Sequence, residues 1–275
     1  MKIPQFIILF GNFLQFISPK LASLYAAKLF STPFKHKIPK RELEMDEKSN
    51  QKLLLIPAIN KEIVVYQYGI SHKKVLLVHG WSGRGTQLYK IADELLNNGY
   101  STLSFDAPAH GKSPGSTTLL PEFVASILEL DKQFGPFEFA IGHSLGGMSI
   151  LRAVTEALVV KKAVIIGSGD VIQDIIDDFL LKLKLSKKIG LLMKQLFEKK
   201  SGTTMESLSS YVSAQSVAIP VLILHDKNDA DVHVNCSKNI HKHLIGSKLV
   251  VTENLGHRKI LAEKNVIETI INFLN

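Results

Sequence analysis

The sequence has few of the features that place a protein outside the ordinary globular class. It has a single cysteine, Cys236, so no disulfide can form within the chain, and we expect a reducing, cytoplasmic location. It has no internal repeat, no low-complexity tract and no long block of like charges, which argues against a disordered protein. No nucleic-acid-binding pattern accompanies its net charge of +8, so we expect no nucleic acid as a partner.

Long apolar runs are also missing, although the N-terminus comes close to one. The stretch IPQFIILFGNFLQFIS, followed by Pro19 and LASLYAAKLF, is interrupted by Gln5, Asn12 and Gln15. It falls short of the roughly 18 to 20 apolar residues of a spanning helix, and no convincing cleavage site follows it. Two alternatives remain. The segment is either a helical pair packed on the body of the protein or a peripheral membrane contact through residues 1–35, which neighbouring lysines would assist.

The 275 residues suit one large domain, which we expect over residues 50–275, preceded by an apolar helical segment over residues 1–45. Short β-rich runs begin after residue 50, and several of them are apolar throughout, as a parallel sheet covered on both faces requires. The expected strands are 62–69, 74–80, 101–108, 137–144, 162–169, 220–226 and 247–253.

Helical periodicity fills most gaps between these runs. The expected helices are 87–97, 120–134, 145–158, 234–244 and 262–273. This alternation predicts an α/β fold with a doubly wound, mostly parallel sheet. One gap, about residues 170–218, is too long for a simple crossover, so we predict a small helical insertion there.

The most specific motif is Gly142-His143-Ser144-Leu145-Gly146, between an expected strand and an expected helix. In such an elbow the serine is held in a strained backbone conformation that exposes its hydroxyl. The two glycines let the strand and the helix approach closely. We therefore predict that Ser144 is a catalytic nucleophile.

A serine hydroxyl needs a histidine to take its proton and a carboxylate to orient that histidine. Asp229 follows the strand expected at 220–226, and His257 follows the last expected strand. This gives the chain order Ser, Asp, His that accompanies the elbow motif. We predict Asp229 as the acid and His257 as the base, with Asp226 and Asp231 as the competing carboxylates.

Acyl transfer also requires N–H donors for the negative oxygen of the tetrahedral intermediate. The elbow supplies the backbone N–H of Leu145, and the turn after the strand expected at 74–80 supplies that of Trp81. We predict these two groups as the oxyanion hole. His79, in the same turn, is expected to brace it rather than transfer a proton.

The remaining histidines form no metal-binding pattern. His225, His233 and Cys236 are close in sequence, but their spacing matches no zinc motif, so we expect neither a metal nor a cofactor. Solvated side chains are expected for the histidines of loops and helix surfaces, which are His36, His72, His241 and His243.

These motifs resemble the α/β-hydrolase superfamily, in its esterase, lipase and serine-aminopeptidase-like group, over residues 50–275. Two residues, Ala109 and Asp226, stand where many relatives have glycine. The resemblance implies that the insertion at about 170–218 is a cap that controls access to the substrate pocket. The segments that carry the resemblance are His79-Gly80, the loop from Asp106 to Ser113, Gly142 to Gly146, His225 to Val232, and Gly256-His257.

The leading functional hypothesis is hydrolysis of a carboxylic ester, or a related acyl bond, through an acyl-enzyme on Ser144. The expected partner is a small-molecule acyl substrate. Because relatives with dehalogenase or epoxide hydrolase activity would have aspartate at the nucleophile position, Ser144 argues against both. An acyltransferase, a peptidase or a thioesterase could use the same triad. A membrane-associated binding protein without turnover is the alternative from another class, and the sequence predicts no oligomeric state.

Overall fold

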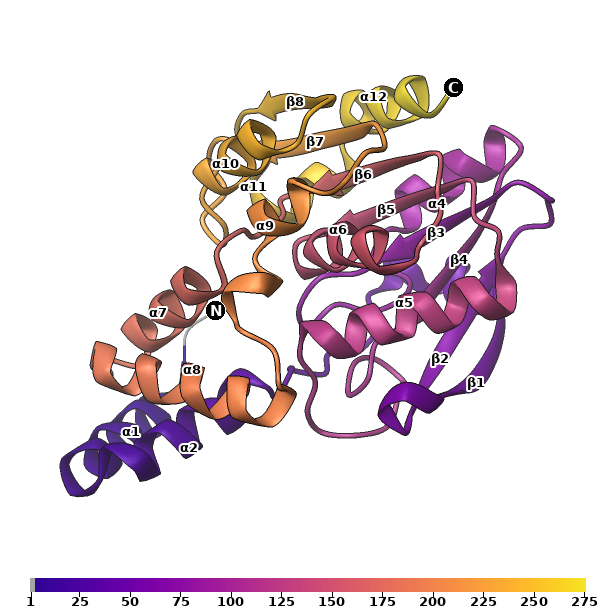
Figure 1. The fold of residues 1–275 in the computed structure, drawn as a ribbon. Coiled ribbons are helices and arrows are strands. Elements are labelled where there is room, and N and C mark those ends of the chain that lie inside the picture. Colours follow the sequence, from indigo (N-terminus) through magenta and orange to yellow (C-terminus); the bar gives the residue numbers. More distant parts are fainter. Residues whose placement is uncertain (1–2) are drawn as a thin grey trace.

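The computed structural model describes residues 3–275 and contains an eight-stranded sheet (Figure 1). The strand order across the sheet is β1-β2-β4-β3-β5-β6-β7-β8. The strands are β1 (Asn50–Ile56), β2 (Lys61–Tyr68), β3 (Lys74–Val78), β4 (Ser101–Asp106), β5 (Phe139–His143), β6 (Lys162–Ile166), β7 (Val221–Asp226) and β8 (Ser247–Thr252).

Most neighbouring strands in this sheet are parallel. β4, β3, β5, β6, β7 and β8 pair in parallel, whereas β2 is antiparallel to both β1 and β4. Each strand expected from the sequence is present, with its ends shifted by a few residues. The predicted α/β class with a doubly wound, mostly parallel sheet is therefore confirmed.

β1 is not predicted by the sequence pattern. It lies at the edge of the sheet, and Leu53 and Leu55 face solvent instead of a core. A tight turn joins it to β2, with Asn60 in the left-handed region at a φ of 49°. An edge strand has one unpaired side and a weak burial pattern, so its sequence lacks the alternation that marks a half-buried strand.

Helices cover both faces of the sheet, as alternation along the strands requires. On β3, Val75 and Leu77 pack in one apolar core with α4 (Tyr89–Asn97) and α12 (Lys264–Leu274), whereas Leu76 and Val78 pack in the other core with α5 (Leu120–Phe134) and α6 (Leu145–Glu156). The helices are α1 (Gln5–Ile17), α2 (Pro19–Phe30), α3 (Leu43–Lys48), α4 (Tyr89–Asn97), α5 (Leu120–Phe134), α6 (Leu145–Glu156), α7 (Ile172–Lys182), α8 (Lys187–Ser201), α9 (Ser210–Ala214), α10 (Asn235–His243), α11 (Gly256–Lys259) and α12 (Lys264–Leu274).

An insertion between β6 and β7 consists of α7, α8 and α9, over the region where extra helices are expected. The N-terminal helices α1 and α2 form a hairpin that packs against α7 and α8. Together these four helices make a lobe at one end of the molecule, at the lower left of Figure 1. Within residues 3–275, no helix is long and apolar enough to cross a membrane.

Candidate active site

Ser144 occupies the sharp turn between β5 and α6. Its backbone has a φ of 54° and a ψ of −118°, a strained conformation for a residue with a side chain. Close backbone approach explains the two glycines of the motif. A Cβ on Gly142 would lie 2.6 Å from the carbonyl carbon of Gly146, and a Cβ on Gly146 would lie 2.3 Å from the carbonyl oxygen of Val78. The local geometry is that of the strand–turn–helix elbow expected from the sequence.

The turn after β3 lies directly against this elbow. A Cβ on Gly80 would lie 2.9 Å from the Cβ of Ser144, so the backbone that leads to Trp81 passes next to the serine. The backbone N–H groups of Trp81 and Leu145 donate to no protein acceptor within residues 3–275. Both residues border the same cavity as Ser144. The two expected oxyanion donors are thus available to a ligand at the serine.

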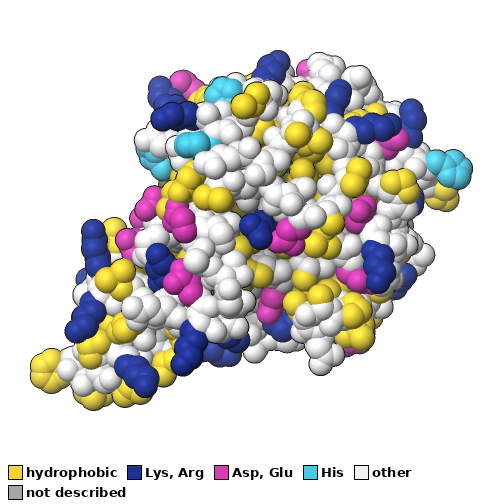
Figure 2. All heavy atoms as spheres, viewed as in Figure 1, with side chains coloured by type: hydrophobic (Ala, Val, Ile, Leu, Met, Phe, Trp, Pro, Cys, Tyr) yellow, Lys and Arg dark blue, Asp and Glu magenta, His cyan; other side chains and the backbone are white. Residues whose placement is uncertain are grey.

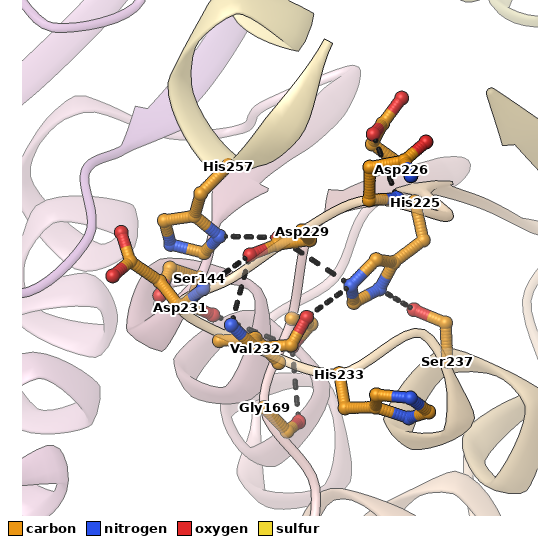
Figure 3. Close-up of polar contacts among 12 residues, drawn as sticks. Ser144, Gly169, His225, Asp226, Asp229, Asp231, Val232, His233, Ser237 and His257 are labelled. Atoms are coloured by element: carbon orange, nitrogen blue, oxygen red, sulfur yellow. Dashed lines mark hydrogen bonds and ion pairs between the residues drawn. The ribbon is translucent and has the colours of Figure 1, made fainter. Parts of the chain in front are cut away.

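His257 and Asp229 form the shortest contact of the group. His257 lies in the first turn of the short helix α11, after β8, and Asp229 lies on the loop after β7. The Nδ1–H of His257 donates to Oδ2 of Asp229 at 2.6 Å (Figure 3). This bond leaves Nε2 of His257 free to accept a proton.

Ser144 and His257 border one cavity, but no hydrogen bond joins the serine hydroxyl to the imidazole in the described part of the chain. Contacts of this kind are often long without substrate and shorten when it binds. The structure therefore brings together the five residues singled out in the sequence, which are Ser144, His257, Asp229, Trp81 and Leu145.

The carboxylate of Asp229 is fixed by several donors. Its Oδ1 accepts the backbone N–H of Asp231 at 2.8 Å and of Val232 at 2.9 Å. Burial by itself raises the pKa of Asp229, but the imidazoles of His225 and His257 and the Val232 N–H outweigh it, so the pKa lies below its ordinary value. The carboxylate therefore stays ionised at neutral pH and can stabilise a protonated His257.

The competing carboxylates point elsewhere. Oδ2 of Asp226 accepts from the Thr252 hydroxyl at 2.8 Å and from the Leu255 N–H at 3.1 Å, which ties β7 to the segment after β8. The side chain of Asp231 is about half exposed, and its nearest basic partner is Arg258 at 4.0 Å. Neither carboxylate bonds to His257.

His225 supports Asp229 from the side opposite His257, and sequence reasoning assigned it no role (Figure 3). It is fully buried at the end of β7, with Nε2 3.5 Å from Oδ2 of Asp229. Its Nε2–H donates to the Val232 carbonyl at 2.9 Å, and its Nδ1 accepts from the Ser237 hydroxyl at 2.6 Å. His225 thus braces the loop that carries Asp229. Its position four residues before that aspartate was the only signal in the sequence.

His143, the residue before the nucleophile, is a second positioning group that sequence reasoning did not single out. Its Nε2–H donates to the backbone carbonyl of His257 at 2.9 Å, and the two rings contact each other in a tilted arrangement with centroids 4.5 Å apart. Burial, with a smaller contribution from His257, lowers the pKa of His143 to about 3. Neutral His143 therefore joins the elbow to His257.

The loop after β4 braces the turn after β3 through histidines. His79 accepts the Ala107 N–H through Nε2 at 3.0 Å, and His110 accepts the Ser82 N–H through Nε2 at 3.0 Å. The bracing role expected for His79 agrees with these contacts. Ala109, which stands where many relatives have glycine, adopts a φ of 66°, a region that costs energy for any residue with a Cβ.

A cavity of about 940 Å³ extends from Ser144 and His257 to the lobe of α1, α2, α7 and α8. Its size is at the upper end of small-molecule sites. The apolar part of its wall combines residues from the hydrolase body, the insertion and the hairpin, such as Met148, Ile172, Phe179, Leu29 and Phe30. No group of three or more His, Cys, Asp or Glu side chains that could hold a metal ion occurs within residues 3–275.

The buried histidines predict that acid destabilises the fold. Burial lowers the pKa of His110 to about 4, and burial with His257 lowers that of His143 to about 3. Below about pH 6.5 the unfolded chain binds protons that the native state does not, so stability falls as the pH falls. From pH 6.5 to 5 we expect the free energy of unfolding to fall by about 3 kcal/mol from these two groups. Urea unfolding at several pH values measures this.

Variants separate the histidines in that experiment. His143→Asn or His110→Asn should each reduce the slope of the free energy of unfolding against pH by the equivalent of about one bound proton. Exposed His72 is the matched control, and His72→Asn should leave the slope unchanged. Equal slopes in the wild-type protein and in both buried-histidine variants would contradict the assignment.

Comparisons with known proteins agree with this fold. Residues 75–209 match a model described as the alpha/beta hydrolase family, and residues 201–275 match one described as TAP-like protein. The chain belongs to the α/β-hydrolase superfamily, which confirms the resemblance seen in its motifs, and it is a hydrolase. No curated protein matches the chain.

Solved structures resemble the chain over most of its length. An esterase from Pyrococcus furiosus has a TM-score of 0.66 at 18% identity, covering 89% of this chain and 97% of its own. An esterase from Exiguobacterium antarcticum has a TM-score of 0.60 at 20% identity, with coverages of 78% and 96%. A bacterial membrane phospholipase A has a TM-score of 0.64 at 16% identity, with coverages of 85% and 88%. At these identities the likeness shows the shared fold.

Proposed function

We propose that the protein is a serine hydrolase that cleaves a carboxylic ester. The observation that carries this proposal is the strained elbow at Ser144, which borders the same cavity as His257. Nδ1 of His257 lies 2.6 Å from Oδ2 of Asp229. A nucleophile, a base and an oriented carboxylate are the parts that acyl transfer requires. The description of two similar structures as esterases agrees with this reaction class.

Each group has a role in the proposed reaction. The Ser144 oxygen attacks the ester carbonyl carbon while Nε2 of His257 takes the hydroxyl proton, and Asp229 stabilises the resulting imidazolium. The N–H groups of Trp81 and Leu145 donate to the negative oxygen. His257 then protonates the departing alcohol, which leaves an acyl-enzyme. Water, deprotonated by His257, releases the acid and restores the serine.

The cavity supports a substrate with a sizeable apolar group. Its wall near Ser144 includes Met148 and Leu145, and its far end is formed by the insertion and the hairpin. Burial of apolar area is the main source of affinity in such a chamber. This composition favours an ester of an apolar acid or alcohol over a charged peptide.

Covalent labelling tests the nucleophile directly. The protein should hydrolyse p-nitrophenyl esters and react with a fluorophosphonate probe, and mass spectrometry should locate the label on Ser144. Ser144→Ala should remove labelling, because the attacking oxygen is gone. Ser82 also borders the cavity and gives a matched control, since Ser82→Ala should still be labelled. Labelling that persisted in Ser144→Ala would defeat the proposal.

A further inference from the structure

The hairpin of α1 and α2 is held on the insertion by its inner face. The Nδ2 group of Asn12 donates to the Leu183 carbonyl at 3.3 Å, and Oε1 of Gln15 accepts the Ser186 N–H at 2.8 Å. Gly11 is buried between Tyr25 and Leu185. Two of the three polar residues that interrupt the apolar N-terminal run, Asn12 and Gln15, are therefore docking contacts.

Small residues fix the second helix of the hairpin in the same way. Ala22, Ala26 and Ala27 are buried, and α2 packs closely against α8. The Phe30 ring makes an edge contact with the Phe179 ring of α7 at 5.2 Å between centroids. The hairpin is thus part of the folded protein, and its orientation is set by the insertion.

The outer face of the hairpin remains apolar although it meets solvent. Single exposed apolar residues are normal on a protein surface, but a contiguous group of this kind marks an interaction site. Phe16 is 92% exposed and Phe6 is 72% exposed. Leu21 and Leu24 continue the exposed face on α2. On α1 it consists of Phe6, Leu9, Phe10, Phe13, Phe16 and Ile17.

The charge of the lobe points to an anionic partner. Residues 3–37 and 172–201, which contain the four helices of the lobe, hold eleven lysines and four acidic residues, Asp174, Asp177, Asp178 and Glu198. Lys20 and Lys28 are exposed on α2 beside the apolar face and make no ion pair within residues 3–275. Hydrophobic and basic side chains lie together over the outer end of the lobe, at the lower left of Figure 2.

The dimensions exclude a spanning arrangement and fit a surface one. α1 has 13 residues and α2 has 12, shorter than the roughly 20 residues needed to cross a bilayer. A helix with one apolar aromatic face and flanking lysines lies in the membrane interface, with the apolar face in the acyl boundary and the cations at anionic headgroups.

The same hairpin also forms part of the cavity wall. Ile3 precedes α1 and Ile7 lies on it, and both border the cavity together with Leu29 and Phe30 of α2. One face of the hairpin therefore lines the chamber that contains Ser144, while the opposite face is the exposed apolar surface. A molecule leaving a bilayer at this face would meet the chamber on the other side of two helices.

We propose that the outer face of the α1–α2 hairpin binds an anionic lipid surface, and that the enzyme takes its ester substrate from that surface. The second part rests on the proposed esterase activity, and the first does not. The lipid surface, rather than a second copy of the chain, is the occupant because the lysines around the face would repel an identical lysine-rich face.

Vesicle sedimentation of the full-length protein tests the binding. The wild-type protein should sediment with vesicles of equal parts phosphatidylcholine and phosphatidylglycerol, and only weakly with phosphatidylcholine alone. The triple variant Phe6→Gln, Phe13→Gln and Phe16→Gln should bind the mixed vesicles at least about tenfold more weakly. The matched control removes equally exposed apolar side chains elsewhere, as Ile70→Gln, Val159→Gln and Ile245→Gln, and should bind like wild type.

A second pair of variants tests the charges. Lys20→Gln with Lys28→Gln should weaken binding to mixed vesicles about tenfold or more, and added salt should weaken wild-type binding in the same direction. Lys238→Gln with Lys242→Gln, on exposed positions of α10, should have no such effect. Equal losses in both lysine pairs would overturn the assignment to the hairpin.

Activity measurements keep the two parts of the proposal separate. The triple phenylalanine variant should hydrolyse water-soluble p-nitrophenyl acetate at the wild-type rate but lose most of its activity on p-nitrophenyl palmitate held in mixed vesicles. Ser144→Ala should lose both activities yet bind vesicles normally, so failure of the esterase proposal leaves the binding result intact. Wild-type protein that ignores mixed vesicles, or that forms a dimer broken by the triple variant, overturns the lipid proposal.

Discussion

His257→Ala is expected to lower kcat for a p-nitrophenyl ester by at least about 10³-fold, because in the proposed reaction His257 takes the proton of the Ser144 hydroxyl. The Nδ1–H bond to Asp229 fixes the ring so that Nε2 alone is available to the substrate side. Steady-state hydrolysis at neutral pH measures the effect. The Ser144→Ala/His257→Ala double variant should be little worse than the poorer single variant, since triad members act as a unit.

His233 provides the control for this experiment. It is an exposed histidine that borders the same cavity, and His233→Ala should change kcat by no more than a few-fold. A fall of only a few-fold in His257→Ala would mean that another base serves Ser144.

Asp229→Asn is expected to lower kcat by about 10⁴-fold while leaving the fold intact. The amide keeps the shape of the side chain but loses the negative charge that orients His257 and stabilises its protonated form. The lowered pKa of Asp229 means that wild-type enzyme has this charge throughout the neutral range. The loss should therefore appear in kcat at every pH near neutrality.

The two neighbouring aspartates are matched controls. Asp231→Asn should have nearly wild-type kcat, because its half-exposed carboxylate makes no contact with His257. Asp226→Asn should lower the free energy of unfolding, since the carboxylate joins β7 to Thr252 and Leu255. A loss of kcat in Asp231→Asn as large as that in Asp229→Asn would reassign the acid.

The parts of the molecule that the sequence predicts well are those whose cause is local. The apolar strands, the alternation with helices and the Gly142 to Gly146 elbow depend on residues within a few positions of one another. The glycines of the elbow are required by contacts with neighbouring backbone, and the motif encodes those contacts directly.

The parts that escaped prediction depend on residues far apart in the chain. His143 acts through the carbonyl of His257, and the two are 114 positions apart. His225 is an exception in distance, because its partners Asp229, Val232 and Ser237 lie within twelve positions of it; its role depends on the path of the loop after β7, which the sequence pattern did not predict. β1 is an edge strand whose apolar residues Leu53 and Leu55 face outward, so its sequence showed neither the alternation of a half-buried strand nor the apolar run of a buried one.

The sequence left open two alternatives for the N-terminal helices. The contacts of Asn12 and Gln15 with the insertion show that one face of the hairpin packs on the rest of the protein. No local sequence pattern encodes these contacts, because their partners are 171 positions away.

The cavity wall contributed by Ile7, Leu29 and Phe30 has a practical consequence for recombinant work. An apolar N-terminal stretch is commonly trimmed before expression to improve handling. Here a protein that began after residue 40 would lack one side of its binding chamber, and the buried face of α8 would be uncovered. Substrate profiles measured on such a shortened protein would describe a cavity that is open on one side. Kinetic work on the specificity therefore requires a protein that retains helices α1 and α2.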